Sequence, residues 1–145
     1  MSGSFCTVVN CMDGRVQLPV IRYLMDRFGV EFVDSVTEAG PIRCLAEPAV
    51  SDARSSILRR VGVSVNAHGS RAVAIVAHAD CAGNPLCREE QMTQLEAAVA
   101  EVGKVFPGVA VLGLWVSEEW VVSEVPGVAA GPAAPVRRSD ERSRS

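Results

Sequence analysis

The chain has 145 residues and a mass of 15.4 kDa, which is the size of one ordinary domain. Apolar residues make up 48% and charged residues 21%, values that are typical of a globular domain and exclude a disordered chain, a collagen or a coiled coil. The longest apolar runs fall far short of the ~20 residues of a membrane-spanning helix, and the formal charge of −3 argues against nucleic acid as a partner.

The first third of the chain predicts two strands separated by a helix. Residues 5–10 (FCTVVN) form a short apolar, β-branched run that is typical of a buried strand. Apolar residues at helical spacing then predict a helix over 18–28, which Gly29 ends. Residues 31–37 predict a second strand, closed by the Ala-Gly-Pro breaker at 39–41.

The rest of the chain continues the alternation of helix and strand. A helix is predicted over 51–66, followed by an entirely apolar strand over 71–77, as expected where helices cover both faces of a sheet. The apolar spacing predicts a further helix over 89–105, then a strand over 109–116. Residues 120–124 could return as an antiparallel strand at the edge.

This alternation predicts an α/β fold with right-handed crossovers and helices on both faces. We expect a mostly parallel sheet of four strands in the order 2-1-3-4, with the antiparallel strand at its edge. Residues 1–125 are predicted to form one domain, and residues 126–145, which offer almost nothing to bury, a mobile tail.

The N-terminal ten residues lack the basic start and apolar stretch of a secretory signal, so we expect a cytoplasmic protein. In a reducing compartment, thiols are metal ligands, catalytic groups or buried small residues more often than disulfides. The five cysteines are Cys6, Cys11, Cys44, Cys81 and Cys87.

Three metal-ligating residue types follow two of the predicted strands. Cys11 comes directly after the first strand, and His78 and Cys81 come directly after the third. Sites in open parallel sheets form beyond the carboxyl ends of the strands. If these two strands are neighbours, ~4.8 Å apart, the three side chains can reach one ion. Two thiolates and one imidazole leave a tetrahedral zinc one open position, as in catalytic rather than closed structural sites.

Asp13 and Arg15 lie in the same loop as Cys11. A carboxylate paired with the guanidinium would stay ionised and could accept a hydrogen bond from a zinc-bound hydroxide, which would make Asp13 a gatekeeper. If Arg15 turned away instead, Asp13 could itself become the fourth zinc ligand. The sequence permits both arrangements.

Two motifs resemble those of the β-class carbonic anhydrases. Residues 11–15 (CMDGR) match the C-x-D-x-R motif of that family, and residues 78–81 (HADC) match its H-x-x-C motif. Gly83 and the segment 115–125 extend the likeness, which covers about residues 5–125. The resemblance implies a zinc enzyme that forms a homodimer or larger oligomer. The site residues it implies are the zinc ligands Cys11, His78 and Cys81 and the dyad of Asp13 and Arg15.

The favoured hypothesis is zinc-dependent hydration of carbon dioxide to bicarbonate, with a metal-bound hydroxide as the nucleophile. Because two thiolates make the metal a poorer Lewis acid, we expect the pKa of its water to exceed ~7 and activity to favour alkaline pH. Hydrolysis of carbonyl sulfide or carbon disulfide, which are linear molecules of similar shape, is the first alternative. A zinc-bound scaffold or sensor without turnover is the second.

For the remaining polar and aromatic residues, structural roles are preferred over catalytic ones. We expect Asp80 to hold its own loop through nearby amides, and His68 to lie on the surface rather than to shuttle protons. Trp115 and Trp120 are interpreted as packing residues. Cys87 is the one spare thiol that could serve as a substitute ligand or redox partner.

Overall fold

The computed structural model of the protein describes residues 3–134. The elements are β1 (Phe5–Cys11), a 3-10 turn η1 (Gly14–Val16), α1 (Gln17–Phe28), β2 (Phe32–Glu38), α2 (Pro41–Ala46), α3 (Asp52–Ala67), β3 (Ala72–His78), α4 (Arg88–Val105), β4 (Ala110–Val116) and β5 (Val122–Ala130). The five strands form one sheet in the order β2-β1-β3-β4-β5. All neighbours pair in parallel except β4 and β5, which are antiparallel. The predicted α/β fold and strand order are confirmed.

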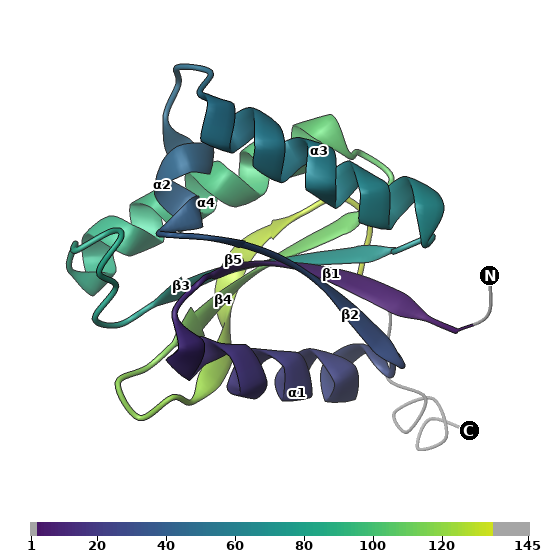
Figure 1. Ribbon diagram of the computed structural model, residues 1–145, viewed down its shortest axis with the longest axis horizontal. Coiled ribbons are helices and arrows are strands. Elements are labelled where there is room, and N and C mark those ends of the chain that lie inside the picture. Colours follow the sequence, from purple (N-terminus) through teal and green to yellow (C-terminus); the bar gives the residue numbers. More distant parts are fainter. Residues whose placement is uncertain (1–2, 135–145) are drawn as a thin grey trace.

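Helices cover both faces of the sheet. Figure 1 shows α2, α3 and α4 on one face and α1 on the other. Every residue of β3 is buried, because this central strand is covered from both sides. On the three-helix face Ile57 of α3 packs in one core cluster with Ile75, and on the other face Leu24 of α1 packs with Ala74.

The pairing of β1 with β3 brings two distant loops together. Thr7 pairs with Val73 and Val9 with Ile75, so the two strands run in parallel and end at the same edge of the sheet. Cys11 is the last residue of β1 and His78 is the last residue of β3. This edge therefore holds the residues that the motifs single out.

The short helix α2 was not predicted. The sequence Ala-Gly-Pro at 39–41 reads as a breaker, but here it begins a helix. Gly40 adopts a left-handed conformation with φ 59°, and Pro41 occupies the first helical turn. Proline is favoured there because the N–H it lacks would have no intrahelical partner.

The predicted boundary of the tail at residue 126 is wrong. β5 begins at Val122 and continues to Ala130, so the boundary falls inside the strand. An edge strand tolerates Pro126 where the ladder is irregular, and Gly127 takes φ 77° beside a register shift between Leu112 and Leu114 of β4. Residues 135–145 of the predicted tail lie outside the described residues. Within 3–134, no helix is long and apolar enough to cross a membrane.

Candidate metal centre

The structure brings the three predicted ligand side chains together at the carboxyl edge of the sheet. Cys11 ends β1, His78 ends β3, and Cys81 lies in the loop that follows. Their ligand atoms all lie within 4.8 Å of one another, and all three residues are buried. The two sulfur atoms are 3.9 Å apart. Zinc–sulfur bonds of ~2.3 Å at a tetrahedral centre place two sulfurs ~3.8 Å apart, so the pair fits a zinc ion.

The imidazole of His78 supplies a second test of fit. Its Nδ1 lies 2.7 Å from the carbonyl oxygen of Ala79. Because a carbonyl oxygen only accepts hydrogen bonds, Nδ1 must carry the hydrogen, which leaves Nε2 with a free lone pair. Nε2 is buried and has no hydrogen-bond partner in the structure. A buried nitrogen left without a partner is costly, and a metal ion would satisfy it.

Hydrogen bonds at the two sulfurs favour one thiolate and one thiol in the pair. The pKa of Cys11 is lowered, chiefly because the Cys81 thiol donates a hydrogen bond to its sulfur, and the same contact raises the pKa of Cys81. The backbone N–H of Gly40 also lowers the pKa of Cys11, and those of Asn84 and Gly83 act in the same direction on Cys81. One proton therefore leaves the pair readily, and a divalent cation would replace the second.

Asp13 and Arg15 form a bidentate ion pair beside the thiols. The Nε of Arg15 lies 3.0 Å from Oδ1 of Asp13, and Nη2 lies 2.7 Å from Oδ2. Oδ1 also accepts the backbone N–H of Arg15 at 2.9 Å, which caps η1. These bonds from Arg15 lower the pKa of Asp13 to about 2. Of the two arrangements that the sequence permits, the structure shows the one with Arg15 paired.

Two glutamines that the sequence analysis missed anchor the ligand residues. Gln17, the first residue of α1, donates from Nε2 to the carbonyl oxygens of Cys11 at 2.7 Å and Asp13 at 2.9 Å. Gln91 of α4 is 2% exposed and donates from Nε2 to the carbonyl oxygen of His78 at 2.9 Å. The sequence offered one indication that Gln91 is buried, namely its position one helical turn before the apolar residue Leu95.

The loops after β2 and β3 touch through two glycines. A Cβ atom on Gly83 would lie 2.7 Å from the carbonyl carbon of Ala39 and 2.8 Å from the nitrogen of Gly40. Both neighbours are backbone atoms, which cannot move aside as a flexible side chain can. Because the backbone of Gly40 lowers the pKa of Cys11 and that of Gly83 acts in the same direction on Cys81, the contact joins the surroundings of the two thiols.

Replacing Gly83 with alanine should therefore push the two loops apart. We expect the free energy of unfolding to fall by about 1–3 kcal/mol, the usual cost of overpacking, together with weaker zinc binding. Denaturant titration and competition with a zinc chelator measure the two effects. Gly108→Ala is the control, since a Cβ there meets nothing within 4 Å. Wild-type zinc affinity in Gly83→Ala would show that the contact does not shape the site.

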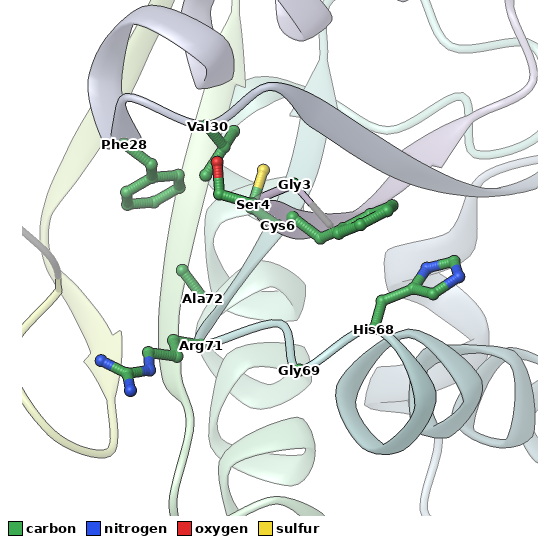
Figure 2. Close-up of a pocket in the computed structure, with 10 residues that line it drawn as sticks. Gly3, Ser4, Cys6, Phe28, Val30, His68, Gly69, Arg71 and Ala72 are labelled. Carbon is green, nitrogen blue, oxygen red and sulfur yellow. The ribbon is translucent and has the colours of Figure 1, made fainter. Parts of the chain in front are cut away.

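The second histidine lies at the other end of the sheet. His68 caps the C-terminus of α3, and its Nδ1 bonds to Asp34 at 2.5 Å. It is one of the residues that line a cavity of about 280 Å³, in which Figure 2 shows the side chains of His68 and Arg71 pointing in opposite directions. β3 separates His68 from His78 by ~20 Å, which is too far for direct proton transfer to the metal site.

The three other cysteines lie outside the ligand cluster. Cys6 is buried within β1, and Cys44 is half-buried on α2. Cys87 is exposed and donates a hydrogen bond to Oε1 of Glu90 at 3.1 Å. Within residues 3–134, one group of three potential metal ligands has converging donor atoms, and it consists of Cys11, His78 and Cys81.

Fold and site together define an α/β protein with a two-thiol, one-imidazole cluster suited to a divalent metal at the carboxyl edge of its sheet. The family model described as "Putative carbonic anhydrase" matches residues 1–126. The chain belongs to this carbonic anhydrase family, as its two motifs predicted. No curated protein sequence matches the chain.

Three solved structures with the same fold are β-carbonic anhydrases. Isoform I from Trichomonas vaginalis is 18% identical, with 88% of this chain and 83% of that chain covered and a TM-score of 0.56. The β-carbonic anhydrase CcaA is 14% identical, with 90% and 85% covered and a TM-score of 0.52. A tetrameric enzyme from Sordaria macrospora is 11% identical, with 88% and 82% covered and a TM-score of 0.50. At such identities the likeness establishes the fold.

Proposed function

We propose that the protein is a zinc enzyme that hydrates carbon dioxide to bicarbonate and a proton. The observation that carries this proposal is the convergence of Cys11, His78 and Cys81 beside the ion pair of Asp13 and Arg15. Membership of the carbonic anhydrase family supports it. Carbonyl sulfide hydrolysis and a zinc-bound scaffold are the outcomes that the test must separate from it.

Each residue has a distinct part in this proposal. Cys11, His78 and Cys81 would hold the zinc ion, which when bound supplies the positive charge that lowers the pKa of water far below its bulk value and so makes a nucleophile. Ionised Asp13 only accepts hydrogen bonds, so it favours a nucleophile that still carries a hydrogen and disfavours anions that carry none. Arg15 keeps Asp13 ionised and holds its orientation.

The direct test measures turnover and metal on one preparation. Stopped-flow assays follow proton release from carbon dioxide and, in parallel, sulfide release from carbonyl sulfide, while zinc content is determined by elemental analysis. We expect one zinc per chain and faster turnover of carbon dioxide. Faster turnover of carbonyl sulfide would reassign the substrate, and full zinc with neither activity would favour the scaffold.

We propose that acid inactivates the enzyme through its metal ligands rather than through Asp13. Because Arg15 lowers the pKa of Asp13 to about 2, this carboxylate stays ionised at about pH 5. The thiolates must give up protons to bind zinc, so falling pH favours metal release. Released zinc, measured with a chromogenic chelator, should rise in step with the loss of activity. Inactivation with zinc fully retained would contradict this prediction.

We also propose that the chain self-associates. The Sordaria macrospora enzymes, which share its fold, are described as tetrameric, and this supports the proposal. Light scattering on the purified protein should give a mass of at least twice 15.4 kDa. The cytoplasmic location and the absence of nucleic-acid and membrane partners stay predictions from the sequence.

A further inference from the structure

Arg15 is held by more than its partner in the dyad. Its Nη1 lies 3.2 Å from Oδ2 of Asp80, and its Nη2 also lies 3.2 Å from the carbonyl oxygen of Asp80. The guanidinium carbon lies 4.6 Å from the centre of the Trp120 ring. Three loops, those after β1, β3 and β4, thus meet at one guanidinium.

Backbone conformation singles out the same two residues. Within residues 3–134, the non-glycine residues with positive φ are Asp80 at 56° and Trp120 at 61°. This left-handed region is disfavoured for a side chain as bulky as tryptophan, and such strain persists where the surrounding structure enforces it. Both strained residues direct a group onto Arg15: a carbonyl and a carboxylate from Asp80, and a ring face from Trp120.

The turn that carries Trp120 is braced and linked to the metal loop. The carbonyl oxygen of Ser117 accepts the N–H of Trp120 at 3.0 Å, and the N–H of Ser117 donates to the carbonyl oxygen of Val121 at 3.0 Å. Directly before this turn, the carbonyl oxygen of Val116 accepts the N–H of Ala79 at 3.0 Å. The backbone that carries Trp120 is therefore tied to the loop that bears His78 and Cys81.

We propose that Trp120 and Asp80 are positioning residues that keep Arg15 paired with Asp13 and so keep this carboxylate from closing the metal site. The proposal rests on the proposed function for the role of Asp13. It replaces the sequence interpretation of Trp120 as a packing residue and of Asp80 as a holder of its own loop. The two residues act through Arg15 and need not touch the substrate.

Trp120 is expected to restrain Arg15 more strongly than the side chain of Asp80 does. The Asp80 side chain is 82% exposed and that of Arg15 is 45% exposed, so their carboxylate contact contributes little. The backbone carbonyl of Asp80 survives replacement of the side chain. The ring of Trp120 is half-buried and covers one face of the guanidinium, and it is therefore the stronger restraint.

The test uses hydrosulfide, an anion that carries a hydrogen and is therefore accepted by ionised Asp13, as a probe of the open metal position. The protein is loaded with cobalt(II), and hydrosulfide binding is followed by the change in visible absorption. If Arg15 is released, Asp13 competes with hydrosulfide for the metal. We expect Trp120→Leu, which keeps an apolar side chain but loses the ring, to weaken hydrosulfide binding roughly 2- to 30-fold. Trp120→Phe should restore most of the affinity, and Asp80→Asn should cost less than about 5-fold.

A double-mutant cycle shows whether Trp120 acts through Arg15. In an Arg15→Ala background, Trp120→Leu should have no further effect, because the group that the ring restrains is gone. Val121→Ala is the matched control, since this neighbour in the same turn is 61% exposed. It should leave hydrosulfide affinity unchanged in both backgrounds.

Several results would overturn the proposal. Wild-type hydrosulfide affinity in Trp120→Leu would do so, as would equal losses in the two backgrounds of the cycle. A wild-type protein that takes up no hydrosulfide would show that Arg15 fails to keep the position free. If the wild type binds hydrosulfide and the cycle shows coupling, but carbon dioxide is not hydrated, the proposed function is rejected while the positioning role stands. If Trp120→Leu does not fold, Trp120→Met, which also lacks the ring, decides in the same cycle by the same criterion.

Discussion

Replacing His78 with alanine is expected to abolish metal retention, lowering the zinc content from one per chain to nearly none. Nε2 of His78 is the single nitrogen among the three converging ligand atoms. Two thiolates and water make a much weaker site for zinc than the three protein ligands typical of catalytic centres. Cys11→Ser should have the same effect, since an alcohol is a poor replacement for a thiolate. Elemental analysis after gel filtration gives the content directly.

The matched control for this prediction is Cys87→Ser. This thiol is exposed and lies outside the ligand cluster, so the zinc content should stay at the wild-type value. Circular dichroism of each variant separates loss of metal from loss of fold. Full zinc content in folded His78→Ala would show that the ligand assignment is wrong. Loss of zinc in Cys87→Ser would show that Cys87 is a ligand.

The second large effect is expected for Asp13→Asn, which should retain zinc but lower kcat/KM for carbon dioxide by about 10²- to 10³-fold. The range is that of a lost, preorganised hydrogen-bonding partner in an active site. The amide has nearly the same shape but carries no charge. It donates as well as accepts hydrogen bonds, so it no longer pairs ionically with Arg15 or selects nucleophiles that carry a hydrogen.

Stopped-flow hydration on zinc-matched samples measures this effect. Glu96→Gln makes the same chemical change on the exposed face of α4, away from the site, and should leave kcat/KM unaltered. Full activity in Asp13→Asn would show that the ion pair only stabilises its loop. Loss of zinc in the same variant would mean that Asp13 helps to hold the metal.

Local patterns were sufficient to predict most of the fold. The apolar runs of β1 and β3 and the spacing of the apolar residues in α1 and α4 each act over a few neighbouring residues, so they can be seen in the sequence. The helix α2 and the extension of β5 were missed because they depend on non-local contacts. Val128, near the end of β5, is buried against a core built from residues distant in the chain.

The sequence by itself determined which side chains could make a metal site, because C-x-D-x-R and H-x-x-C carry that chemistry within a few residues. Only the tertiary structure decided how those side chains are held. Three sets of contacts join segments that are far apart or carry no motif: the anchoring of the ligand loops by Gln17 and Gln91, the contact of Gly40 with Gly83, and the contact of Arg15 with Trp120. The pairing of parallel strands aligns the ends of distant segments at one edge, and packing between the loops there sets the geometry of the site.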